Sequence, residues 1–114
     1  MTQAEALGLT LLVEAAVGAG LGRWLGRPRW QGGLCFVAAS LCTHPLVWAS
    51  NQALVGFLPF VARAAVLETT VSLVEAAMAR LALGASWPRA LGAGFVVNGA
   101  SFGVGITVWF FGLG

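Results

Sequence analysis

LVEAA is the sequence of residues 12–16 and, again, of residues 73–77. Each copy places one glutamate, Glu14 or Glu75, inside a long run of Ala, Leu, Val and Gly. The chain has only 4 acidic residues among 114, so half of them lie in sequence that otherwise favours lipid. The surroundings of these two glutamates therefore bear on both the fold class and the function.

The chain as a whole is too apolar for a water-soluble domain. It is 59% hydrophobic and only 9% charged, whereas soluble domains carry about 25% charged residues. Its apolar runs approach the roughly 20 residues that a helix needs to cross a bilayer. We therefore predict an all-α integral membrane protein with a single transmembrane domain over residues 1–114. A net charge of +2 is too small to indicate a nucleic-acid partner.

Four membrane-spanning helices are predicted, over residues 5–22, 33–50, 60–83 and 90–112. The three breaks between them contain Gly, Pro or both, as turns require. Five of the six arginines lie in or beside the first and third breaks, and the positive-inside rule assigns that side to the cytoplasm. Both termini would then face outside, and we expect the protein in a bacterial inner membrane.

The repeated pentapeptide belongs to a longer internal similarity. A shift of 61 residues aligns 12–48 with 73–109 without a gap, and 10 of the 37 aligned positions are identical. We predict an internal repeat, 5–50 and 66–111, that builds a four-helix bundle from two parallel helical hairpins. Glu14 and Glu75 would then lie at matching depths.

The third predicted helix separates polar from apolar residues. One stripe at 3-4 spacing is apolar and is expected to face lipid: Leu67, Val71, Val74, Met78 and Leu81. The neighbouring stripe is small or polar and is expected to face protein or a cavity: Glu68, Ser72, Glu75, Ala79 and Ala82.

Other polar residues at membrane depth extend this pattern. A charged side chain at the bilayer centre costs roughly 2.5–3.5 kcal/mol on insertion scales. Glu14 and Glu75 should therefore be protonated, or paired with a polar residue, a cation or a ligand. Together these residues form the predicted ion-, proton- or substrate-binding site: Glu14, His44, Glu68, Glu75, Asn98 and Ser101.

Each candidate also has a structural interpretation. Buried carboxyls can join helices by hydrogen bonds, as Asn98 and Ser101 commonly would, and Glu68 could pair with Arg63. His44 precedes Pro45, which predicts a kinked helix. His44 could alternatively ligate a metal, a haem or a pigment, although metal sites usually need several clustered donors. No metal or cofactor is assigned.

The sequence contains no nucleophile elbow, no H-E-x-x-H and no phosphate-binding loop, so an enzyme is disfavoured. We predict a small transport or ion- and proton-handling protein. The alternatives are a non-catalytic accessory subunit of a membrane complex and a His-ligated pigment- or haem-binding subunit. Because four short helices should enclose little volume, a homo-oligomer or other membrane subunits are expected as partners. The GxxxG pairs 18/22 and 99/103 predict close helix crossings, within or between protomers.

Overall fold

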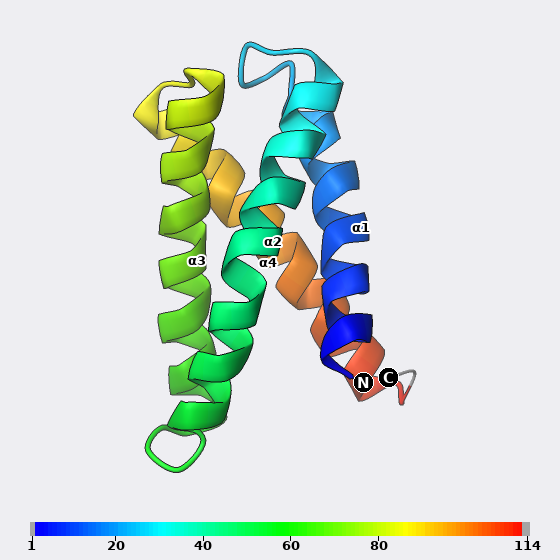
Figure 1. Cartoon of the computed structure of the whole chain (residues 1–114), viewed down its shortest axis with the longest axis vertical. Helices are drawn as coiled ribbons and strands as arrows, with labels where there is room; N and C mark the ends of the chain where they lie inside the picture. Colours follow the sequence, from blue (N-terminus) through cyan, green and yellow to red (C-terminus); the bar gives the residue numbers. More distant parts are fainter. Residues whose placement is uncertain (1, 113–114) are drawn as a thin grey trace.

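Four helices make up the computed structural model, which describes residues 2–112 (Figure 1). They are α1 (Gln3–Leu21), α2 (Arg29–Leu54), α3 (Phe60–Leu83) and α4 (Trp87–Phe110). Residues 2–112 contain no strand, so the predicted all-α class is confirmed. Residues 1, 113 and 114 of the predicted domain lie outside the described residues.

Helices α1, α2 and α4 are long and apolar enough to cross a membrane, which supports the prediction of an integral membrane protein. Helix α3 is of similar length but carries four charged residues: Arg63, Glu68, Glu75 and Arg80. Its 24 residues would extend about 36 Å at a rise of 1.5 Å per residue. Helix α3 is therefore long enough to span a membrane, and it differs from α1, α2 and α4 in its larger number of charged residues.

Local sequence explains most of the helix ends. Thr2 caps α1, because its hydroxyl oxygen accepts a 3.1 Å hydrogen bond from the Glu5 backbone N–H. Gly84 ends α3 with φ of +67°, a left-handed conformation that favours glycine, and its N–H donates to the Arg80 carbonyl. Pro88 lies in the first turn of α4, where a missing backbone N–H costs nothing.

The predicted start of the second helix is wrong. It begins at Arg29 rather than at residue 33, and Gly32 and Gly33 lie inside it. The backbone of both glycines packs closely against α1. A Cβ on Gly32 would come within 2.3 Å of the Gly18 carbonyl oxygen. Close packing therefore explains these glycines, and the chain does not turn there.

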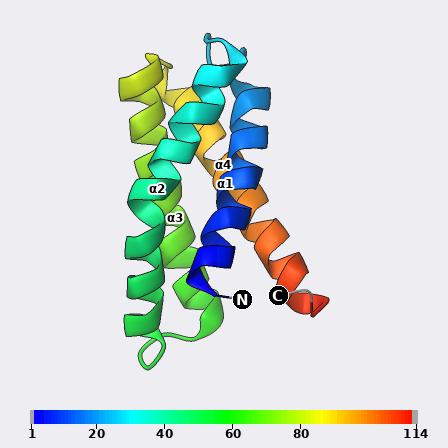
Figure 2. The same ribbon diagram turned by 45° about the vertical axis from the view of Figure 1, so that its right-hand side comes forward.

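The helices form a ring in which each packs against two neighbours. Helix α1 contacts α2 and α4, and α3 contacts the same two helices. Both chain ends lie at one end of the bundle, opposite loops 22–28 and 84–86 (Figures 1 and 2). In Figure 2 the axis of α2 changes direction partway along its length, as expected of a helix that contains Pro45.

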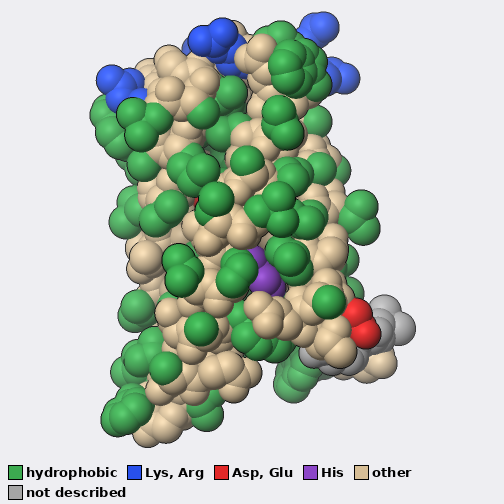
Figure 3. All heavy atoms as spheres, viewed as in Figure 1, with side chains coloured by type: hydrophobic (Ala, Val, Ile, Leu, Met, Phe, Trp, Pro, Cys, Tyr) green, Lys and Arg blue, Asp and Glu red, His purple; other side chains and the backbone are tan. Residues whose placement is uncertain are grey.

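The tightly packed core occupies one half of the bundle. We call the end with loops 22–28 and 84–86 the arginine end, because the blue side chains in Figure 3 gather there. Apart from Val71, every buried apolar residue lies between that end and the middle of the bundle: Leu25, Cys35, Phe36, Ala39, Ala76, Ala79, Leu83, Ala85, Ala90, Ala93 and Val97. Toward the termini α1 separates from α2, and α3 separates from α4 (Figure 1).

The outer surface is largely apolar, as a lipid-facing surface should be. Large side chains such as Leu12, Phe57 and Leu81 are 72–86% exposed. The apolar stripe predicted for α3 is wrong at one position, because Val71 is buried. Val71 lies one turn before Glu75, and residues four apart share a helix face, so it points inward with that glutamate.

Candidate functional site

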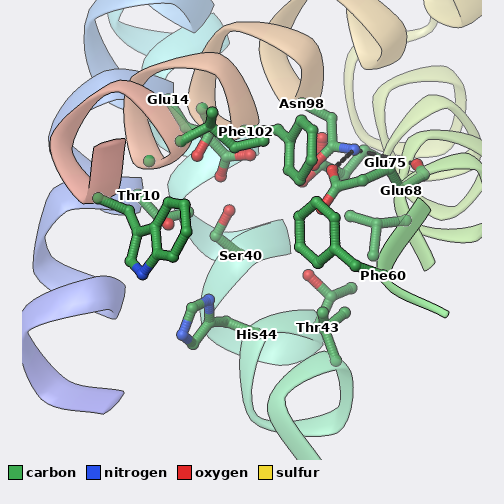
Figure 4. Close-up of a pocket in the computed structure, with 16 residues that line it drawn as sticks. Thr10, Glu14, Ser40, Thr43, His44, Phe60, Glu68, Glu75, Asn98 and Phe102 are labelled. Atoms are coloured by element: carbon green, nitrogen blue, oxygen red, sulfur yellow. Dashed lines mark hydrogen bonds between the residues drawn. The ribbon is translucent and has the colours of Figure 1, made fainter. Parts of the chain in front are cut away.

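A cavity of about 640 Å³ lies between the four helices, in the half of the bundle nearer the termini. All six residues predicted to form a site line it, and Figure 4 shows five of them by name, from four different helices. On each helix, the lining residue nearest the arginine end is polar: Glu14 on α1, Ser40 on α2, Glu75 on α3 and Asn98 on α4. The closed end of the cavity is therefore a polar layer that lies directly on the apolar core.

Small residues in the core set the position of the two glutamates at the closed end. Gly18 lies one turn beyond Glu14 and Ala79 one turn beyond Glu75, and both are buried at helix contacts. Because these residues let the helices approach closely, little room remains beyond the carboxyls. The carboxyl groups consequently turn into the cavity (Figure 4).

Glu14 and Glu75 are almost completely buried, with 1% and 0% of their surfaces exposed. Their carboxyl groups lie within hydrogen-bonding reach of one another. No other described residue donates to Glu14 Oε2 or to either Glu75 oxygen. A hydrogen bond between two carboxyls requires a proton on one of them, and two bare carboxylates at this distance would repel strongly. The pair can therefore hold a proton or a bound cation between its members.

Glu68 is held differently, by an amide on the neighbouring helix. Asn98 Nδ2 donates to Glu68 Oε2, to the Glu68 carbonyl oxygen at 3.0 Å and to Ser72 Oγ at 3.1 Å. The Ser72 hydroxyl itself donates to the Glu68 carbonyl. These bonds join α3 to α4 beside the cavity.

The suggested pairing of Glu68 with Arg63 is wrong. Arg63 Nε donates to Asn51 Oδ1 at 3.0 Å and Nη1 donates to the Leu58 carbonyl at 2.8 Å. The guanidinium therefore closes the loop between α2 and α3, and it does not neutralise the carboxyl one and a half turns further along the helix.

His44 lies on the cavity wall nearer the termini. Its Nε2 atom is buried and has no hydrogen-bond partner among residues 2–112. The ring lies 6.1 Å from the ring of Trp48, centroid to centroid. The single histidine is also visible from outside, on the side of the bundle drawn in Figure 3. It therefore lies between the interior and the lateral surface.

Sequence reasoning missed part of the cavity wall. Thr43 and Phe60 line it, as does the buried Val71. Helical spacing contained the signal, because Thr43 follows Ser40 by three residues and Phe60 precedes Glu68 by eight. Phe60 was placed at the start of the predicted helix, but a search for polar residues at membrane depth passes over an aromatic wall residue.

The ionisable side chains that line the cavity are mainly acidic. Its lining contains three glutamates and one histidine, and none of the lining residues is an arginine. Within residues 2–112, no group of three or more His, Cys, Asp and Glu side chains is arranged to hold a metal ion. The site is thus acidic and has room for a ligand, but it lacks the clustered donors of a metal centre.

No protein-family model matches the chain, and neither a curated protein nor a solved structure does. The chemistry of the site must therefore be inferred from its own side chains.

Proposed function

We propose that the protein is a small membrane transport protein that moves protons or cations through its acidic cavity. One observation carries the proposal: Glu14 and Glu75 bury two carboxyls against each other with no partner from any other described residue. Intramembrane carboxyls are costly and are typical of ion pathways and proton relays. A pair that can exchange a proton for a cation is the central element of such a device.

The other cavity residues have roles suited to their positions. Glu68, nearer the termini, would form an outer access site. His44 would be the coupling partner of the carboxyl pair, because imidazole changes its charge near neutral pH. Asn98 and Ser101 would be polar wall residues.

The proposed membrane arrangement has α3 as the fourth span, with its glutamates turned away from lipid. The two hairpins would be duplicates related by rotation about the bilayer normal. Two contacts support this: a Cβ on Gly33 would lie 3.1 Å from the Ala15 carbonyl, and one on Gly94 would lie 3.1 Å from the Ala76 nitrogen. A shift of 61 residues converts one pair of residues into the other. By arginine placement, the arginine end would face the cytoplasm of a bacterial inner membrane, with both termini outside.

The expectation that four short helices enclose little volume is wrong. Four helices of one chain enclose about 640 Å³, so one protomer suffices to form the cavity. A homo-oligomer or a larger membrane complex stays a prediction, but the volume of the cavity no longer argues for it.

Flux measurements on purified protein in liposomes test the proposal. With a cation gradient imposed, the wild-type protein should carry protons or cations across the membrane. The double variant Glu14→Gln/Glu75→Gln should lose most of this flux, because Gln has the size of Glu but cannot release a proton. Glu5→Gln is the matched control, since Glu5 lies exposed in the first turn of α1 outside the cavity lining.

Unchanged flux in the double variant would rule out the proposed transport role. It would favour the alternative, an accessory subunit in which the two carboxyls only join helices. Circular dichroism and size-exclusion chromatography of each variant show whether the fold survives the substitution.

A further inference from the structure

The acidic cavity also has features that specify the class of ligand it would accept. We propose that it binds a hydrophobic ammonium ion that carries N–H groups, with the nitrogen on the Glu14–Glu75 pair and the apolar body against the aromatic wall. This inference rests on the proposed function and deepens it, because it names the substrate class. Its four supports are the open acceptors, the wall, the volume and the position of His44.

The open acceptors specify a hydrogen-bond donor. Glu14 Oε2 and both Glu75 oxygens are buried without a donor from any other described residue. Even when the two carboxyls share one proton, oxygens without a donor remain, and each is costly to leave unmet. A primary ammonium group presents three N–H donors and a positive charge, whereas a quaternary ammonium presents the charge alone.

The charge of the pair matches a monovalent ion. Two carboxyls that share one proton carry a net charge of −1, which a single ammonium group neutralises. A divalent metal ion fits poorly, since Ca²⁺ needs six to eight oxygen ligands and residues 2–112 form no metal-binding cluster. Glu68 is already engaged by Asn98 and need not contribute a second charge.

The wall and the volume specify an apolar body. Three aromatic residues, Phe60, Phe102 and Trp109, line the cavity on the side of the termini. Val47 and Ile106 add aliphatic surface to its wall. Aromatic faces attract organic cations and pack well against rings and alkyl chains. The volume of about 640 Å³ lies within the range of roughly 300–1,000 Å³ for small-molecule sites. A bare inorganic ion would leave most of this volume unfilled and the aromatic wall without a packing contact.

The position of His44 suggests how such a ligand enters. His44 lines the cavity and is visible from the side of the bundle in Figure 3. A hydrophobic ammonium ion concentrates in the bilayer with its charge near the head groups. From there it could pass between helices, with the unpartnered His44 Nε2 as a polar contact on the way.

Binding to the purified chain in zwitterionic nanodiscs tests the inference by calorimetry, with empty nanodiscs subtracted for partition into lipid. The probe is 4-phenylbutylamine. Two matched analogues have the same body: its N,N,N-trimethyl derivative keeps the charge without N–H groups, and 4-phenylbutan-1-ol is neutral. We expect the amine to bind at least about tenfold more tightly than either analogue, because a lost charged hydrogen bond costs about that factor or more.

Substitutions locate the site. Glu14→Gln and Glu75→Gln should each weaken amine binding at least about tenfold, while Glu5→Gln should leave it unchanged. Equal binding of the amine and the trimethyl derivative would overturn the requirement for N–H groups. The inference would be overturned altogether if the amine did not bind, or if neither Glu14→Gln nor Glu75→Gln changed its affinity. The comparison of analogues uses the wild-type chain and does not depend on the folding of any variant.

The inference and the proposed function can fail separately. Carboxyl-dependent flux of protons or inorganic cations without amine binding would retain the function and reject the ligand class. Amine binding that depends on Glu14 and Glu75, in a chain that carries no flux, would retain the site and reject transport.

Discussion

At the scale of single residues, close backbone contacts explain glycines that have no conformational role. Gly32 packs against α1 so closely that an added Cβ would lie 2.3 Å from the Gly18 carbonyl oxygen and 2.9 Å from the Gly22 Cα. Both neighbours are backbone atoms, so neither can swing aside. The GxxxG pair at 18/22 therefore marks a crossing inside the protomer, whereas Gly99 and Gly103 have no atom nearby that a Cβ would touch.

Gly32→Ala should consequently destabilise the chain. Overpacking a tight contact typically costs about 1–3 kcal/mol, because α1 and α2 must move apart to admit the methyl group. The free energy of unfolding in mixed detergent micelles measures the loss. Gly20→Ala is the matched control, since nothing lies within 4 Å of the added carbon, and it should be neutral or slightly stabilising. Equal stability of the two variants would contradict the packing at this crossing.

Residue spacing indicates which positions face inward, because these recur every three to four residues on a helix, and all six predicted site residues line the cavity. It did not reveal what those residues contact. Glu68 is paired with Asn98 rather than with Arg63 on its own helix. Which of two polar neighbours a side chain reaches depends on the rotation of adjacent helices, and this information is absent from the periodicity of one helix.

At the scale of elements, loop arginines tie the hairpins together at the arginine end. Leu83 is the last residue of α3, and its carbonyl accepts a 2.9 Å hydrogen bond from Nε of Arg27 in the first loop. Arg89 on α4 donates to the Trp24 carbonyl at 2.9 Å, and its guanidinium lies 5.9 Å from the Trp24 ring. Besides the orientation predicted from their placement, these cations cap a helix and join segments distant in sequence.

Arg27→Gln should therefore loosen the attachment of the first hairpin to α3. The bond is partly buried and charge-assisted, so we expect a loss of about 1 kcal/mol in the free energy of unfolding. Arg23→Gln removes the same charge from the same loop, where the structure gives the side chain no hydrogen bond within residues 2–112, and it should cost less. If both substitutions destabilise equally, net charge rather than the Leu83 contact explains the effect.

At the scale of the whole molecule, the bundle is closed at one end and open at the other. Glycines and alanines cluster at the helix contacts near the arginine end, whereas Phe60, Phe102 and Trp109 occupy the wall near the termini. The sequence contained this difference in side-chain size along the bundle. Periodicity predicts each helix separately, however. The volume between four helices depends on all of their crossing angles together, so the volume of the cavity was not predicted.

The closed arginine end should face the cytoplasm, so that the cavity opens outward. In a variant without Cys35 and Cys42, single cysteines at Gly56 in the second loop and Ser86 in the third report opposite ends of the bundle. Gly56 has open space around it, and the Ser86 side chain makes no capping hydrogen bond, so both tolerate substitution. A membrane-impermeant maleimide added to intact cells should label position 56 at once and position 86 only after permeabilisation. The reverse pattern would mean that the five arginines at this end do not set the orientation and that the acidic cavity opens toward the cytoplasm.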